Sequence, residues 1–354
     1  MAGLGDPPGG PPEGGPGGGE DEYRSVVFDE SFIRAARLQE FSAQERIADH
    51  APAVRRRAPL RRGLSRQALI LVVLIAVAFG TAIYMGVRHP AQSPSVRAAE
   101  PVRMTVVPLA PQGRVPGAAD VALLYERSPA AHFRTAAEGV PLPGARRTAH
   151  FSDDQVMSAL TTAKDYIVRS ALDPGVLRGE EVRSVRVLLD PDQLAQFDAS
   201  FERPAADGRH APTGWLVRFD PARAEPTDDE IRVRGSLRAV ESDASTLEVT
   251  ADHTMVYPLR PPGDEKARAS LFTVRRELHF RFDRDDLRLH QTQLVASYVQ
   301  AGPLSCAEDS ANHLRPLLAG QTARTGGPAD TDPYTTDDAG GLCGTLAKSA
   351  QPAV

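Results

Sequence analysis

The stretch FTVRRELHFRF, residues 272–282, decides the fold class because its side chains alternate with a period of two. This alternation is typical of an antiparallel strand with one dry face and one wet face. We interpret the consecutive charges Arg275, Arg276 and Glu277 as a solvated cross-strand charge ladder. The predicted dry face holds Phe272, Val274, Leu278, Phe280 and Phe282, and the wet face holds Arg275, Glu277, His279 and Arg281.

Further strands with the same period are predicted on both sides of this one. The aspartates of DRDD, residues 283–286, favour a turn that reverses the chain, although the same letters resemble a metal-binding D-x-D. A first strand is predicted within residues 102–111, where two prolines weaken the pattern. The remaining predicted strands are residues 215–219, 231–238, 247–257 and 287–299.

Helices are predicted before the strands. Ser152 and Gln155 have the spacing of a capping box, and the helix that they begin ends before Asp173-Pro174. A second helix begins at Asp190, and a short third one is predicted within residues 310–320. Helices followed by a strand meander predict an α+β fold. We expect a curved antiparallel sheet with helices on its dry face, as in the nuclear-transport-factor-2-like or cystatin-like cone.

This α+β domain is predicted to cover residues 104–320, and a polar, glycine-rich tail follows at residues 321–354. Cys306 and Cys343 are the two cysteines of the chain, and both fall in this part. If this part is exported, the pair predicts a disulfide that ties the tail to the domain. In the chain-entropy model such a bond stabilises the fold by up to about 3–4 kcal/mol. Two buried thiols are the alternative.

A long apolar run precedes the domain. Residues 68–87 contain no charge and no proline, and as a helix they are about 30 Å long, the thickness of the hydrocarbon core of a bilayer. This predicts a transmembrane helix rather than a buried core helix, which would keep a polar stripe. A cleaved signal peptide is the other alternative, and cleavage near Ala78 stays open. The length of the preceding segment favours an uncleaved signal anchor.

Arginines flank this run on one side. They predict an N-terminus in the cytoplasm, so the chain after a linker at residues 88–103 lies outside the cell membrane. The cluster also has the composition of a site for anionic lipid headgroups, and the alternative is a topology signal alone. The cluster lies mostly in the juxtamembrane segment, residues 51–67, and consists of Arg55, Arg56, Arg57, Arg61, Arg62 and Arg66.

Two further segments come before the arginines. Residues 1–22 are rich in glycine and proline and are predicted to be disordered. Residues 23–50 predict one amphipathic helix capped by Asp29. A helix this short needs a surface to dock on, so residues 29–47 are predicted to bind a cytoplasmic or membrane protein, with lipid or no partner as alternatives. The predicted contact residues are Phe28, Phe32, Ile33, Ala36, Phe41 and Ile47.

The composition and the absence of known motifs argue against several classes of function. The chain has 354 residues and a net charge of −5, which argues against a nucleic-acid partner. It has no phosphate-binding loop, no G-x-S-x-G, no S-x-x-K of the penicillin-binding type and no H-E-x-x-H. We therefore predict no catalytic residue, no cofactor and no bound metal. A cone-shaped domain can hold a pocket, and Trp215 and His253 are the candidate lining residues.

Several segments of the chain together carry a family resemblance. They are SVVFDESFIRAARLQEFSAQERI, GWLVRFDP, DHTMVYPLR, LFTVRRELHF, QAGPLSC, LRPLLAG and DPYT. They resemble a poorly characterised family of single-pass membrane proteins from spore-forming, streptomycete-like actinobacteria, and the resemblance covers most of the chain beyond Gly19. It implies a Gram-positive cell envelope and an association with spore-wall synthesis, and it brings no catalytic residues.

These observations predict a non-catalytic, single-pass cell-envelope protein. Its inner helix would dock a cytoplasmic or membrane partner, and its exported domain would bind a cell-wall component or an exported protein. An envelope enzyme or small-ligand binder with a pocket in the concave sheet is the first alternative. A transmembrane regulator is the second, and the chain has no cysteine before the apolar run that would support a zinc motif there.

Overall fold

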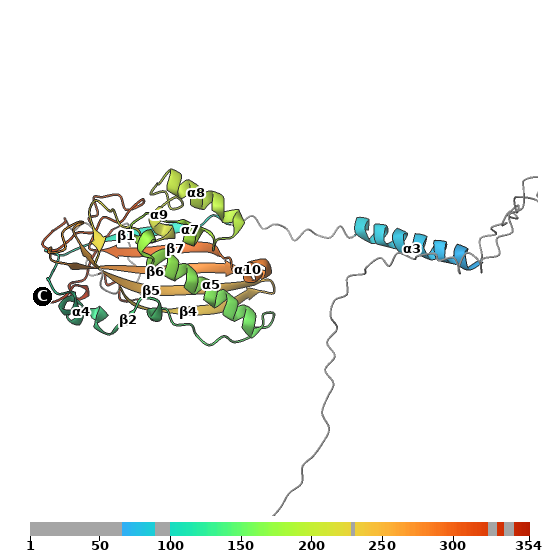
Figure 1. Cartoon of the computed structure of the whole chain (residues 1–354), viewed down its shortest axis with the longest axis horizontal. Coiled ribbons are helices and arrows are strands. Elements are labelled where there is room, and N and C mark those ends of the chain that lie inside the picture. The colour runs from blue at the N-terminus through green and yellow to red at the C-terminus, as the bar shows by residue number, and fades with distance from the viewer. Residues whose placement is uncertain (1–65, 89–99, 228–230, 325–330, 336–342) are drawn as a thin grey trace, which may run out of the picture. The chain divides into compact units, whose positions relative to one another are not determined.

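The computed structural model describes residues 66–88, 100–227, 231–324, 331–335 and 343–354 (Figure 1). The chain divides into two compact units, residues 1–90 and residues 91–354, which are considered separately. The predicted N-terminal tail, the predicted amphipathic helix and the arginine cluster except Arg66 lie outside the described residues.

The first unit contributes one described helix, α3 (Arg66–Arg88), which takes in the whole uncharged run. The large apolar side chains between Leu69 and Phe79 are 49–67% exposed. Within the part of the chain that the structure describes, no helix meets the length and apolarity required to cross a membrane. The predicted transmembrane helix is therefore not confirmed.

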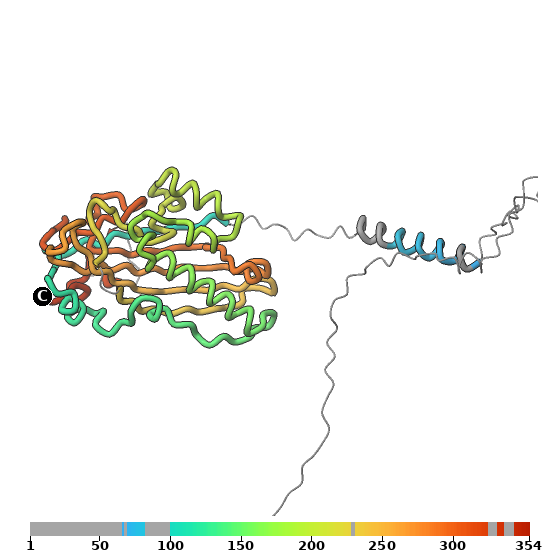
Figure 2. Tube along the Cα trace, viewed as in Figure 1, coloured from blue at the N-terminus to red at the C-terminus, as the bar shows by residue number. Residues whose placement is uncertain are grey.

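The second unit is built on an open, largely antiparallel sheet (Figures 1 and 2). The strand order is β2-β4-β5-β6-β7-β1-β8, and β3 pairs with β5 beside this path. Strands β4 to β7 form a continuous antiparallel meander, whereas β1 pairs in parallel with β7 and with β8. The mixed α+β class is thus confirmed. The strands are β1 (Arg103–Ala110), β2 (Arg134–Thr135), β3 (Glu225–Pro226), β4 (Arg232–Asp243), β5 (Thr246–Arg260), β6 (Ser270–Phe282), β7 (Gln293–Gly302) and β8 (Gly344–Thr345).

The helices of this unit are mostly short. The longest, α5 (Asp153–Ala171), begins at the predicted capping box, in which Ser152 and Gln155 bond each other's backbone N–H, and it ends before Pro174 as predicted. The others are α4 (Val121–Glu126), α6 (Pro174–Leu177), α7 (Arg183–Arg186), α8 (Leu194–Glu202), α9 (Pro212–Trp215), α10 (Arg284–Leu289), and the 3₁₀ turns η1 (Pro129–His132), η2 (Ala136–Gly139), η3 (Pro191–Gln193) and η4 (Lys348–Ala350).

The main core lies between one face of the sheet and the helices around α5 (Figure 1). The apolar stripe of α5, which includes Leu160 and Ile167, packs against the apolar face of the sheet, which includes Phe280. Tyr166 stacks edge-on against Phe280 with ring centroids 5.2 Å apart. The dry face predicted for residues 272–282 is therefore confirmed.

Within the described residues, the opposite face of the sheet is covered at one end. A small apolar cluster around α4 and η1 packs there, and Tyr125 Oη donates to the carbonyl of Val256 at 3.0 Å. The C-terminal segment covers the adjoining rows, where Thr254 Oγ1 donates to the carbonyl of Pro333 and the hydroxyls of Thr273 and Tyr334 bond each other, both at 3.0 Å. Residues of the predicted tail are thus part of the fold.

Two predicted strand segments are wrong. Residues 215–219 are not a strand: Trp215 ends α9, and Leu216, Val217 and Phe219 are buried in irregular chain. Residues 284–289 form α10 instead of continuing the sheet. The carboxylate of Asp283 accepts hydrogen bonds from the N–H groups of residues 285 and 286, so the aspartates begin a helix rather than a tight turn. The helix predicted within residues 310–320 is irregular chain.

The predicted charge ladder forms a cross-strand ion pair at Arg275, but the prediction that Arg275 and Arg276 are solvated is wrong. Arg275 is 2% exposed and Arg276 is 1% exposed, because they lie on opposite faces of β6 and both faces are covered at this level. Arg275 binds Asp252 through two bonds of 2.9 and 3.0 Å. Arg276 points into the main core.

Candidate functional site

In the described residues the sheet has two edges that are largely unpaired, the outer edge of β4 beyond Val233 and the outer edge of β1, and a groove lies along the second. β8 meets this edge only at Leu109 and Ala110. At the other end, Met104 N donates to the carbonyl of Gly208 at 2.8 Å. Backbone groups point to the same edge at every second residue of a strand, so the N–H and C=O of Val106 also point outward, whereas the outward C=O of Pro108 accepts from the N–H of Gly344 in the β1–β8 ladder. No hydrogen bond from Val106 to this side is found among the described residues.

A groove with a volume of about 520 Å³ runs along this edge. Its floor is formed by residues of β1 from Met104 to Pro108. One wall is the loop around Gly208, which has a positive φ of 78° that glycine adopts without strain. The lining residues outside β1 are Ala206, Gly208 and Ala211 on this wall, and Cys306, Ala307, Glu308, Asp309, Ser310 and Ala311 on the other.

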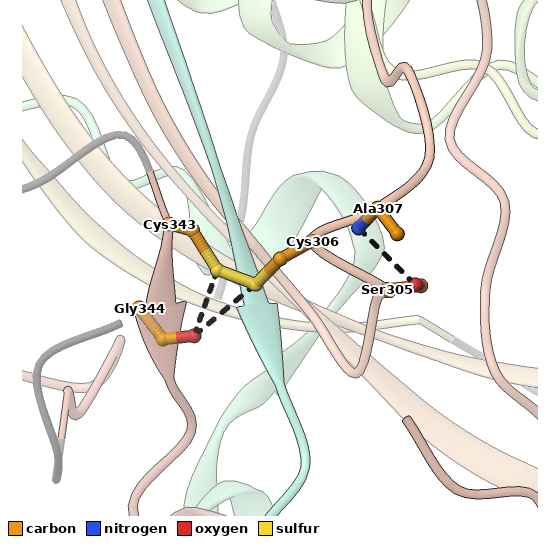
Figure 3. Close-up of a disulfide and its surroundings, with 5 residues drawn as sticks. All are labelled: Ser305, Cys306, Ala307, Cys343 and Gly344. Carbon is orange, nitrogen blue, oxygen red and sulfur yellow. Dashed lines mark hydrogen bonds between the residues drawn. A yellow bond between two sulfur atoms is a disulfide. The ribbon is translucent and has the colours of Figure 1, made fainter. Parts of the chain in front are cut away.

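Two anchors hold the second wall in place. Cys306 and Cys343 form the predicted disulfide, which joins this wall to the start of β8 beside β1 (Figure 3). The carbonyl oxygen of Gly344 lies 3.6 Å from Sγ of Cys343 and 3.9 Å from Sγ of Cys306. At the other end of the wall, Thr213 Oγ1 donates to the carbonyls of residues 310 and 311 at 2.6 and 2.9 Å. The groove is thus framed by a covalent bond and by buried hydrogen bonds.

The groove is acidic. Among the residues that the structure describes, Glu308 and Asp309 are its charged lining residues, and no lysine, arginine or histidine lines it. Glu308 Oε1 lies 3.7 Å from a guanidinium nitrogen of Arg223, and Glu308 Oε2 is enclosed without a hydrogen-bond partner among the described residues. Asp309 Oδ1 accepts from Ala311 N at 2.8 Å, and its side chain is exposed. The surface therefore offers unpaired backbone groups next to two carboxylates.

A second, smaller cavity of about 280 Å³ lies where the chain enters β1. Gln196 spans it, bonding the N–H and C=O of Val102 at 2.8 and 3.1 Å and the carbonyl of Arg209 at 2.9 Å. These bonds already satisfy the polar groups at its centre. We therefore assign it a structural role, which is to fix the start of β1.

The two predicted pocket residues line neither cavity. Trp215 is fully buried in the main core, where its Nε1 donates to Ser200 Oγ at 2.9 Å. His253 is 1% exposed on the core side of β5, directly opposite Gly235 and Arg276 on the neighbouring strands. The space that a ligand would need at these residues is filled by side chains.

Arg276 occupies the centre of this core, and no carboxylate in the described part of the chain pairs with it. Its guanidinium donates to Ser170 Oγ and to the carbonyl of Trp215, both at 2.8 Å, and to the carbonyl of Gly214 at 3.2 Å. Burial lowers the pKa of Arg276 and raises that of Tyr166, whose hydroxyl shares the Trp215 carbonyl. These bonds link β6 to α5 and α9, so the cluster organises the core rather than an open site.

His253 predicts a pH-dependent stability. Burial, together with the charge of Arg276, lowers its pKa to about 4, whereas the unfolded chain has a value near 6.5. Below pH 6.5 the unfolded state binds a proton that the folded state does not. Stability is therefore expected to fall between pH 6.5 and pH 4, by up to about 3 kcal/mol. Urea unfolding of wild type and of His253→Leu at several pH values measures this, and the variant should lose less stability on acidification.

The comparison with the variant isolates the histidine. Asp286, whose pKa burial raises to about 7, titrates in the same range with the opposite sign, because its folded state gains a proton as the pH falls. This contribution is common to both proteins and cancels in the difference. Equal pH slopes for the two proteins would show that His253 is not held neutral.

No protein-family model, no curated protein and no solved structure matches this chain.

Sequence reasoning found the disulfide and missed the groove. One signal was present: Pro108 has no N–H, and proline is found in sheets mainly on edge strands. Which strands pair with β1 depends on residues far away in the sequence, so no local pattern near residues 103–110 predicts the pairing.

Proposed function

We propose that this chain is a non-catalytic, membrane-anchored protein of the cell envelope that connects a partner on the cytoplasmic side with a partner on the outer side. The observation that carries the proposal is the separation of the chain into a unit with an apolar helix and a compact α+β unit with an unpaired sheet edge in a groove. This arrangement suits an anchored binding module.

The sequence supports the anchor. Helix α3 coincides with the uncharged run of residues 68–87, and its large apolar side chains are half to two-thirds exposed. Water disfavours such a surface, and a bilayer removes the cost. The arginines before the run and their scarcity after it support an N-terminus in the cytoplasm. In this proposal the disulfide forms outside the cytoplasm, where such bonds persist.

The groove supports the outer half of the proposal. It combines unpaired backbone groups, a fixed wall and two carboxylates, features that bind a protein segment without any chemical step. The position of α5 against one face of the sheet is also compatible with a nuclear-transport-factor-2-like or cystatin-like cone, which we retain as a proposal for the fold. The spore-wall setting implied by the family resemblance is likewise a proposal.

The inner half of the proposal rests on the amphipathic helix predicted at residues 29–47. Phe32→Asp combined with Ile33→Asp is expected to abolish recovery of the cytoplasmic or membrane partner in a crosslinking pull-down from cells. The loss of one buried aromatic anchor costs about 2–4 kcal/mol, which weakens a complex about 30-fold or more. The Cys306–Cys343 disulfide should be unchanged, because the substitutions lie outside the folded domain.

Ser31→Asp combined with Ser42→Asp is the matched control, because it adds the same charge to the opposite face of the predicted helix. This control should retain the partner. If both double variants recover the same proteins as wild type, the predicted helix does not dock, and the inner half of the proposal is wrong. If neutralising Arg55, Arg56 and Arg57 alone releases the segment in a salt-dependent way, the docking surface is lipid.

A further inference from the structure

We propose that the groove at the β1 edge recognises a short extended peptide segment with a basic side chain, which adds to the sheet as one more strand. This inference rests on the proposed outer binding function and names the partner class for that groove. Strand addition supplies affinity through main-chain bonds, and the side-chain contacts supply selectivity.

The chain itself already pairs with both ends of this edge. At one end, β8 adds in parallel, and Leu346 N donates to the carbonyl of Ala110 at 2.8 Å. At the other end, the carbonyl of Gly208 accepts from Met104 N. The unpaired part between them, Thr105 to Val107, is about 10 Å long at the rise of a β-strand. The gap therefore accommodates about three residues of an extended segment.

The donors and acceptors of the gap fit a strand better than a compact ligand. In a regular ladder, the N–H and C=O of one residue bond a C=O and an N–H of the neighbouring strand. The outward N–H and C=O of Val106 would bond an added strand in the same way. The C=O of Pro108 already accepts from the N–H of Gly344, so β8 closes this end of the gap. The two groups of Val106 lie along the strand direction on the floor of the groove, whereas a compact ligand would need donors that converge on one point.

The negative charge of the groove favours a basic side chain in the bound segment. Glu308 and Asp309 stand on one wall, and none of the described lining residues is cationic, although Arg223 lies 3.7 Å from Glu308 Oε1. A lysine or arginine in the added strand would pair with these carboxylates at a partly enclosed site, where charge-assisted hydrogen bonds are strong. An acidic segment would meet repulsion from both carboxylates, so the groove discriminates against it.

The test uses the full-length chain in nanodiscs and three fluorescent heptapeptide mixtures. The mixtures have Val, Ile, Thr or Tyr at all flanking positions and Lys, Gln or Glu fixed at the centre. The Lys mixture is expected to bind about tenfold more tightly than the Glu mixture at low salt, and the difference should shrink as salt rises. N-methylation of alternate amides in the Lys mixture should abolish binding, because it removes the main-chain donors that pair with β1.

Glu308→Gln combined with Asp309→Asn is expected to reduce the preference for Lys to less than about twofold. The matched control is Glu138→Gln combined with Glu248→Gln, which changes the net charge equally at exposed positions away from the groove and should keep the preference. The inference is overturned if the Lys and Glu mixtures bind equally, if the N-methylated mixture binds as well as its parent, or if no mixture binds. The outer binding function itself is judged separately, by crosslinking in cells.

Discussion

An alkaline phosphatase domain fused after Arg103 is expected to be active in cells, and the same domain fused after Gln67 is expected to be inactive. This enzyme needs disulfides that form outside the cytoplasm. The two fusion points lie on either side of the uncharged run at residues 68–87, and the arginines before the run place its N-terminal side in the cytoplasm. A fusion after Val354 should be active as well.

Deleting residues 68–87 from the Val354 fusion is the matched control, and it should remove the activity. Membrane fractionation of the active fusion then separates an anchor from a cleaved signal peptide. An anchored chain keeps its full mass and stays with the membranes, whereas cleavage near Ala78 would release a shorter product. Activity of the Gln67 fusion, or inactivity of both fusions beyond the run, would contradict the proposed topology.

The sequence was most informative where one face of an element is buried and the other is wet. Strands β4, β5 and β6 were found because their side chains alternate, and α5 was found from the capping box at Ser152. It was least informative at residues 215–219, where Leu216 and Val217 are both fully buried. Without a wet side no period distinguishes a strand from irregular chain, and Pro212, at the first helical position of α9, was the available signal.

The two arginines of β6 show a second limit. Arg276 occurs at an even position together with Val274 and Leu278, so strand parity alone places it on the apolar face. Because arginine is charged, the sequence instead predicts a solvated side chain at this position. Arg275 is on the other face, and its burial depends on the C-terminal segment that carries Pro333 and Tyr334. That packing joins residues far apart in the sequence, and no local pattern encodes it.

The candidate site has the same long-range origin. The groove exists because β1, the first strand, pairs with β7, the last long strand, and because β8 covers only two of its residues. The disulfide was predictable from two cysteines in a segment expected to be exported. Its role as the anchor of the groove wall follows only from the position of Cys306 beside β1 (Figure 3).

The central claim is that a partner docks in the groove at the β1 edge on the outer side of the membrane. Photocrosslinking in intact cells tests it most directly, with benzoylphenylalanine placed at Ala206 or at Ala307. These two exposed alanines lie on opposite walls of the groove. Ala244, an exposed alanine in the turn between β4 and β5, is the matched control.

The account predicts that Ala206 and Ala307 yield an adduct of the same mass and that Ala244 yields none. Because the carboxylates select the partner, Glu308→Gln combined with Asp309→Asn should reduce the yield of this adduct by about tenfold. Binding at the edge would leave Ala244 unlabelled, since the partner covers only the groove. Absence of any adduct from both walls, or the same adducts from Ala244, would contradict the claim.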